Sequence, residues 1–102
     1  MIKYYINKDK RQVIGVLDGT RYDAVNKIVK LLNGTTFDSY NERYLMPSSF
    51  KAIVTCDPAD EFDPNVGKEI AKDRIMDRYY NSLDKRIDIF VADVHAIYNK
   101  VF

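Results

Sequence analysis

This chain of 102 residues has little of several residue types that mark whole protein classes. It contains one cysteine, so an internal disulfide is excluded, and a lone thiol fits a reducing compartment such as the cytosol. Three prolines and four glycines are too few for a collagenous or low-complexity chain. No run approaches the roughly 20 apolar residues of a membrane span, and the first residues lack the apolar core of a signal peptide. We therefore expect a cytoplasmic globular domain.

Net charge is nearly absent as well. Sixteen basic and fifteen acidic residues leave a formal charge of +1, which favours neither a nucleic-acid coat nor an acidic mimic of nucleic acid. What the chain does have is apolar surface: 46% of its residues are hydrophobic and 13% are aromatic, enough for a small core. The length and composition predict one domain.

The order of apolar residues predicts the secondary structure. Alternating apolar residues are typical of strands, and apolar residues three or four apart are typical of helices. Thr20 and Asp23 have capping-box spacing, and Asp57 and Asp63 each precede a proline as helix N-caps do. The predicted elements are strands over 2–6 and 13–17, a helix over 21–33, a loop over 35–48 with a short strand near 43–46, a strand over 50–56 and a helix from 64 onward.

These elements predict an α+β fold, in which a small antiparallel sheet (β-β-α-β) is followed by a long C-terminal helix or helix pair. Asn81-Ser82 is the point at which the helix would break in two. Residues 1–63 would form the sheet domain, and 64–102 a helical arm of the same domain.

The C-terminal helix carries a heptad pattern, with apolar residues at alternating steps of four and three. A small sheet covers only about half of such a helix, so the rest would be exposed apolar surface unless a partner covers it. We expect a homodimer or higher oligomer. Its interface would contain the seam residues Leu83, Ile87, Phe90, Val94, Ile97 and Val101.

Catalytic motifs are missing. Cys56 and the only histidine, His95, lack a recognisable orienting group or oxyanion site, and no phosphate-binding loop or zinc-protease motif is present. The acidic residues Asp57, Asp60, Glu61 and Asp63 do not have the spacing of a calcium-binding loop, and two of them already serve as caps. We expect no enzyme, no cofactor and no metal site.

The start of the C-terminal helix has features of an anion site. Gly67 permits close approach to free helix amides, and Lys68 adds a positive charge. Arg74 and Arg78 follow on one helical face, where two guanidinium groups can each bind phosphate oxygens bidentately. The alternative is a solvated face balanced by nearby acids (Glu69, Asp73 and Asp77).

A second basic feature is the turn between the first two predicted strands. Lys8, Lys10 and Arg11 lie there, and such a hairpin can follow a nucleic-acid backbone. The alternative interpretation is a charged turn that only keeps the hairpin soluble.

The segment from Lys51 to Arg78 resembles a segment of small phage and prophage proteins of Gram-positive bacteria. The shared pattern is a strand that ends in Cys56, then Pro58, Asp60, Phe62 and Asp63, then Gly67-Lys68, and an Arg one turn later. The resemblance covers about a quarter of the chain, and residues 1–50 match nothing comparable. It implies phage origin and expression in a bacterial cytoplasm.

Small phage proteins without catalytic residues are often counter-defence factors, such as anti-CRISPR proteins or anti-Thoeris sponges that sequester cyclic nucleotides between subunits. Under a sponge mechanism, Arg74 and Arg78 would bind phosphate. The leading hypothesis is a non-enzymatic phage-type binding protein that counteracts host defence by sequestering a nucleotide signal or occluding a defence protein. The alternative is a nucleic-acid-associated accessory protein that uses the basic hairpin.

Overall fold

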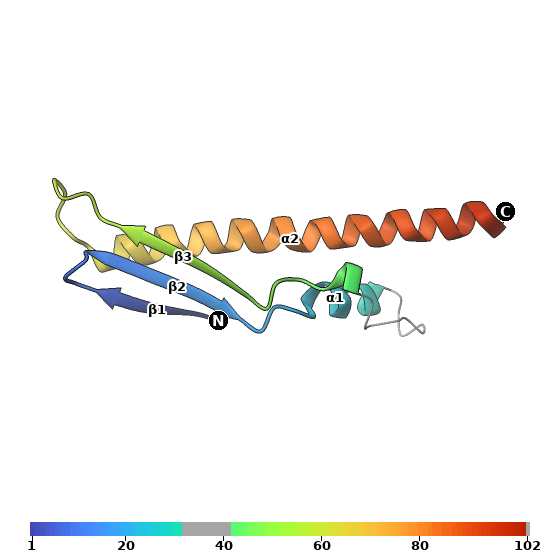
Figure 1. The fold of residues 1–102 in the computed structure, drawn as a ribbon, viewed down its shortest axis with the longest axis horizontal. Coiled ribbons are helices and arrows are strands. Elements are labelled where there is room, and N and C mark those ends of the chain that lie inside the picture. Colours follow the sequence, from blue (N-terminus) through green and yellow to red (C-terminus); the bar gives the residue numbers. More distant parts are fainter. Residues whose placement is uncertain (32–41, 102) are drawn as a thin grey trace. The chain divides into compact units, whose positions relative to one another are not determined.

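The computed structural model describes residues 1–31 and 42–101, without the side chain of Val101. It has the predicted α+β class (Figure 1). The elements in chain order are β1 (Ile2–Asn7), β2 (Gln12–Asp18), α1 (Asp23–Leu31), the 3₁₀ turn η1 (Glu42–Tyr44), β3 (Ser49–Thr55) and α2 (Pro64–Val101). α2 is one continuous helix, so it does not break at Asn81-Ser82. Within the described residues, no helix combines the length and apolar character needed to cross a bilayer.

The sheet is antiparallel throughout and has the order β1-β2-β3. β1 and β2 form the predicted hairpin, and β2 is the central strand. Tyr4 of β1 lies opposite Gly15 of β2, which in turn lies opposite Ala52 of β3. Because both neighbours of β2 are edge strands, each exposes one row of backbone groups that the sheet itself does not pair.

The described chain divides into two compact units. Unit 1 comprises Met1–Gly19 and Ser48–Tyr79, and unit 2 comprises the described residues of Thr20–Pro47 and Tyr80–Phe102. The division runs through α2, whereas the sequence placed a boundary after residue 63. The first half of α2 is an integral part of unit 1, because its residues Ala71 and Ile75 are fully buried.

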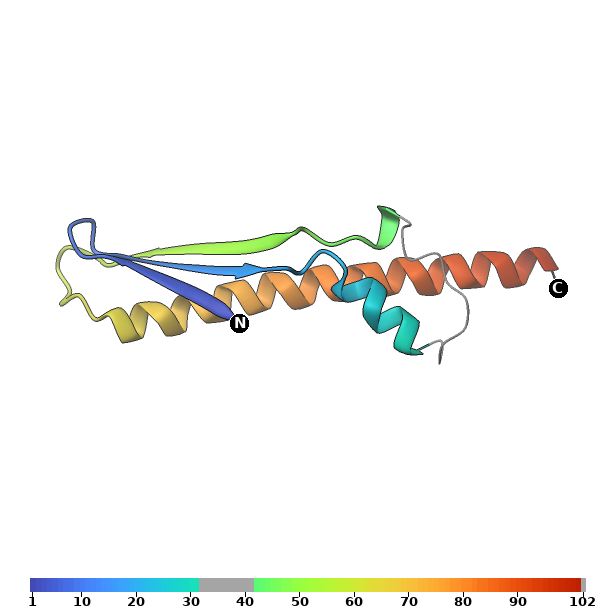
Figure 2. The same cartoon turned by 90° about the horizontal axis from the view of Figure 1, so that it is seen from below.

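In unit 1, α2 lies close along one face of the sheet (Figure 2). Gly15 makes this approach possible: a Cβ atom there would lie 2.9 Å from Cδ1 of Ile75 and 3.3 Å from Cβ of Ala71. At the end of the sheet where β3 begins, the rings of Phe50 and Tyr79 pack edge to face with centroids 5.8 Å apart. The core of unit 1 is therefore a single layer of side chains between sheet and helix.

Unit 2 has its own small core. Val25 and Ile28 of α1 pack with Tyr44 of η1, and Ile89 and Phe90 of α2 contact this cluster. The rings of Tyr44 and Phe90 are edge to face, with centroids 5.9 Å apart.

Two local predictions are wrong. Residues near 43–46 form η1 rather than a strand, because Leu45 N–H donates back to the Glu42 carbonyl at 3.2 Å. Thr20 is not a side-chain cap: its buried hydroxyl donates to the Pro47 carbonyl at 2.6 Å. The predicted helix over 21–33 is observed as α1, and its last two residues lie outside the described part.

A buried phenol joins η1 to α2 within unit 2. Tyr44 Oη donates to Oδ2 of Asp93 at 2.5 Å, and Arg43 pairs with Oδ1 of the same carboxylate at 2.9 Å. Burial, together with the bond to Asp93 and its negative charge, raises the pKa of Tyr44 from 10.0 to about 12, while Arg43 lowers it slightly. The neutral phenol therefore stabilises the fold fully below pH 10, and this contribution is lost as the pH rises through 12.

We expect the free energy of unfolding to fall by on the order of 2 kcal/mol from this group between pH 10 and 12, since each pKa unit corresponds to about 1.4 kcal/mol. Tyr44→Phe should be less stable at neutral pH but should lack this alkaline fall. Urea denaturation across the alkaline range measures both effects. Tyr5→Phe changes an exposed tyrosine and serves as the control; an alkaline fall that persists in Tyr44→Phe would assign it to another group.

Candidate binding pocket

Arg11 connects the β1–β2 turn to the loop that follows β3. Its backbone has a φ of +53°, and its carbonyl accepts the N–H of Cys56 at 2.8 Å. Nη2 of Arg11 donates to Sγ of Cys56 and to the carbonyl of Asp57, both at 3.4 Å, and also to the carbonyl of Asp60. Nε is buried with no hydrogen-bond partner among the described residues. One side chain thus fixes the path of the whole loop.

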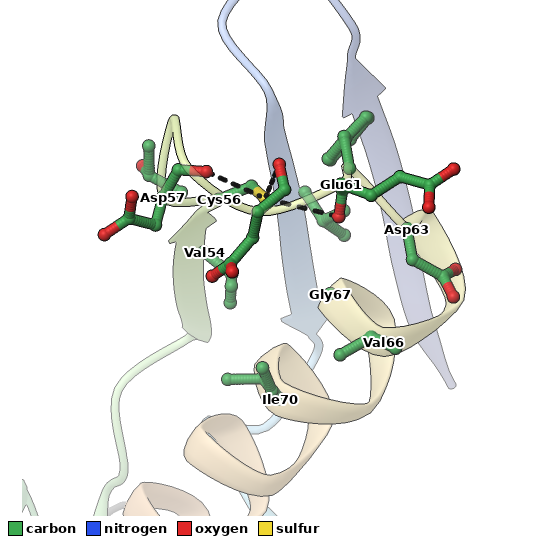
Figure 3. Close-up of a pocket in the computed structure, with 12 residues that line it drawn as sticks. Val54, Cys56, Asp57, Glu61, Asp63, Val66, Gly67 and Ile70 are labelled. Atoms are coloured by element: carbon green, nitrogen blue, oxygen red, sulfur yellow. Dashed lines mark hydrogen bonds between the residues drawn. The ribbon is translucent and has the colours of Figure 1, made fainter.

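Cys56 lies at the centre of this loop (Figure 3). Its Sγ is 3.5 Å from the carbonyl oxygen of Asp57, 3.9 Å from that of Asp60 and 3.7 Å from that of Glu61. A thiol has one hydrogen, so it donates to one of these carbonyls at a time. The loop winds around the sulfur, which gives Cys56 a structural role here.

Of the two aspartates that precede prolines, Asp63 caps a helix as predicted, whereas Asp57 caps a turn, because residues 58–60 form no helix. Oδ1 of Asp57 accepts the N–H of Ala59 at 2.8 Å, and Oδ1 of Asp63 accepts the N–H of Asn65 at 2.9 Å at the start of α2. These bonds satisfy amides that a turn or a helix N-terminus leaves unpaired.

Gly67 sets the distance between α2 and the central strand. A Cβ atom at this position would lie 2.5 Å from Cγ2 of Val13, closer than two carbon atoms can approach. The Gly67 amide donates to the Asp63 carbonyl at 3.1 Å. Gly67 therefore faces Val13 and not an open anion site.

A pocket of about 450 Å³ lies between this loop and the first two turns of α2 (Figure 3). Its apolar lining comes from β2, β3, the loop and α2, and consists of Val13, Val54, Phe62, Val66 and Ile70. Four acidic residues line it from the loop: Asp57, Asp60, Glu61 and Asp63. Among the residues that the structure describes, no lysine or arginine lines it. The lining is thus apolar in its interior and acidic on its loop side, and the Arg11 guanidinium binds carbonyls of the same loop.

The structure does not bring the four predicted anion ligands together. Nζ of Lys68 lies 5.9 Å from the ring centroid of Tyr4, and Tyr4 belongs to the edge strand β1. Nη1 of Arg74 donates to the Ile53 carbonyl at 3.4 Å, and Nη1 of Arg78 donates to the Lys51 carbonyl at 2.7 Å, both on the opposite edge strand β3. With Gly67 packed against β2, these residues are spread across the width of the sheet.

The basic hairpin presents fewer charges than the sequence suggested. Lys8 and Lys10 are exposed, but the guanidinium of Arg11 is turned toward the loop around Cys56. Arg11 therefore has partners within the chain, and its predicted contact with nucleic acid stays a prediction.

Part of the predicted oligomer seam packs inside unit 2. Leu83 is only 6% exposed, so it packs within the chain, and the half-buried Phe90 contacts Tyr44. Ile87 is half-buried, whereas Val94 and Ile97 are 44% and 64% exposed. The side chain of Val101 lies outside the described part of the chain.

The sequence analysis missed the pocket. Eleven of the twelve lining residues lie between Val54 and Ile70, but the sequence does not show how the strands and α2 fold around this loop to enclose a pocket. Val13 comes from β2, Val54 from β3 and Ile70 from α2, and each is one of many apolar residues in its element. Phe62 and the four acids lie in the segment that resembles phage proteins, which was the available signal. Within the described residues, no three His, Cys, Asp or Glu side chains are grouped to hold a metal ion.

Comparison of the chain with models of known protein families, with curated proteins and with solved structures finds no match.

We expect Gly67→Ala to lower the free energy of unfolding by about 1–3 kcal/mol, because the added methyl group overlaps Val13 and forces α2 away from the sheet. Denaturant unfolding of the variant measures this loss. In a Val13→Ala background the same substitution should cost less, since Cγ2 of Val13, the atom in the worst overlap, is gone and only Cβ remains close, at 3.0 Å. Equal costs in both backgrounds would contradict the close contact.

Proposed function

We propose that the protein is a non-enzymatic, phage-type binding protein that acts in the bacterial cytoplasm and counteracts host defence by occluding a partner protein. The partner would insert an apolar side chain into the pocket and place neighbouring Lys or Arg side chains on its acidic loop side. The observation that carries this proposal is the combination of an apolar interior with four acidic residues and no lysine or arginine in the described lining of one pocket.

The volume of the pocket suits such an anchor. About 450 Å³ is at the small end of ligand sites and is enough for one or two large side chains. Burying an apolar side chain there contributes about 1.5–3 kcal/mol. Anchors of this kind, surrounded by weaker polar contacts, supply most of the affinity of protein–protein interfaces.

Charge supports a cationic partner over a nucleotide. Four carboxylates repel the phosphates of a nucleotide and attract lysine and arginine. The residues predicted to bind phosphate are spread over opposite edges of the sheet, with two guanidinium groups donating to strand carbonyls. Of the two mechanisms expected from the sequence, occlusion of a protein is therefore favoured over sequestration of a nucleotide.

The direct test is fluorescence polarisation with labelled seven-residue peptides that carry a central Leu or Phe flanked by Arg or Lys. We expect these peptides to bind, and matched peptides with Glu flanks not to bind. Asp60→Asn and Glu61→Gln should each weaken binding about fivefold at low salt, since a partly exposed ion pair is worth up to about 1 kcal/mol. Ile70→Asp should weaken it more strongly, because it places a charge in the apolar interior.

Glu69→Gln is the matched control. Glu69 is an exposed acid on the same helix that does not line the pocket, so its loss should leave affinity unchanged at equal ionic strength. Binding of Glu-flanked peptides, or of cyclic nucleotides with an affinity that Asp60→Asn does not change, would contradict the proposal. Tight binding to DNA or RNA that Lys8→Glu and Lys10→Glu abolish would favour the basic hairpin instead.

A further inference from the structure

The two edge strands of the sheet in unit 1 differ in what their outward backbone groups bind. β3 carries side chains from α2 along its outer edge, whereas no strand or side chain of the described residues is hydrogen-bonded to the outer edge of β1. An unprotected edge strand is a template for pairing with another chain.

The ladder shows which groups point outward. Cys56 N–H donates to the Arg11 carbonyl, so these residues are a hydrogen-bonded pair, and such pairs alternate along antiparallel strands. With the observed register, the backbone groups of Val13, Gly15 and Leu17 in β2 are hydrogen-bonded to β3. The β2 residues between them are hydrogen-bonded to β1, where their partners are Lys3, Tyr5 and Asn7. The outward backbone groups of β1 therefore belong to Ile2, Tyr4 and Ile6.

The same alternation can be checked at the other edge. It assigns the carbonyls of Lys51 and Ile53 to the outside of β3, and these are the two carbonyls that Arg78 and Arg74 bind. The arginines thus occupy the acceptors that an added strand would need at β3. β1 is left as the edge open to pairing.

We propose that β1 pairs with β1 of a second copy of this chain, antiparallel about a two-fold axis at Tyr4. This register places Tyr4 opposite Tyr4 and Ile2 opposite Ile6 of the other copy, so that the outward groups of both strands meet in about six backbone hydrogen bonds. Registers shifted by two residues keep the same faces together but lose a pair at the end.

The side chains are self-complementary in this register. Ile2 and Ile6 of the two copies meet on the face that α2 covers, where Ile6 is 42% exposed in the single chain. On the open face, Lys3 lies opposite Tyr5 of the other copy in a non-hydrogen-bonded pair, the kind whose side chains are closest. Tyr5 is 56% exposed, so its ring can receive the Lys3 ammonium as a cation–π partner. A second copy is thus the occupant that both backbone and side chains fit.

The test is the mass of the full chain by light scattering over a concentration series. We expect a reversible rise from 11.9 kDa toward twice that value, with a Kd on the order of 1–100 µM for so small a contact. Tyr5→Lys places a second ammonium opposite that of Lys3 and should weaken the dimer at least about tenfold. The double variant Lys3→Glu with Tyr5→Lys restores opposite charges and should return the Kd to within about threefold of the original.

Ile53→Lys is the matched control, because Ile53 is 47% exposed on the same open face but lies on β3. It should leave the dimer intact, and circular dichroism checks that all variants are folded. A mass of 11.9 kDa at every concentration would overturn the proposal. So would a dimer that Tyr5→Lys leaves intact and Val94→Lys abolishes, since that result would place the interface on the exposed residues of α2.

Discussion

The contact between α2 and β2 at Gly67 and Val13 is the constraint on which unit 1 depends. A helix that approaches a sheet this closely needs positions without side chains, and Gly67 and Gly15 supply them on the two elements. The contact sets how far the first turns of α2 lie from the ends of the strands. That distance determines the width of the pocket, and it also brings Arg74 and Arg78 within reach of the carbonyls of β3.

Arg11 holds the loop between β3 and α2 through polar contacts. The loop between β3 and α2 contains four carboxylates in seven residues, which repel one another and favour an extended, solvated loop. The Arg11 guanidinium binds the loop through two backbone carbonyls and the Cys56 sulfur rather than through the carboxylates. Cys56, Asp63 and Gly67 therefore each have a structural role in unit 1, independent of any single activity.

Charge separates the two binding mechanisms that the chain suggests. Basic residues are spread along the edges of the sheet, where they contact carbonyls and an aromatic ring, and acidic residues gather at one pocket. Under the proposed function, the acidic residues would favour a cationic partner, and the apolar interior would favour a side chain over a hydrated ion. The proposed pairing of β1 strands uses a different edge of unit 1, so the pocket and the dimer contact do not compete for residues.

The sequence by itself determined the elements whose signals are local. Alternation predicted the strands, and Asp63-Pro64 predicted the start of α2, because a side-chain cap and the fixed φ of proline act within one turn. It failed at Thr20, where the hydroxyl finds its partner 27 residues away, and at 43–46, where a local 3₁₀ turn forms in place of a strand. It also assigned Leu83 and Phe90 to an interface, since a heptad pattern marks an apolar face without saying what covers it.

Only the tertiary structure decided the roles of Arg11, Gly67, Arg74 and Arg78. In the sequence each was a cation or a flexible residue suited to an anion, and their actual partners lie between 21 and 54 positions away along the chain. Whether a guanidinium faces solvent, a carbonyl or a thiol depends on which strand folds next to it. That choice is made by the packing of α2 on the sheet, a long-range contact that no local pattern encodes.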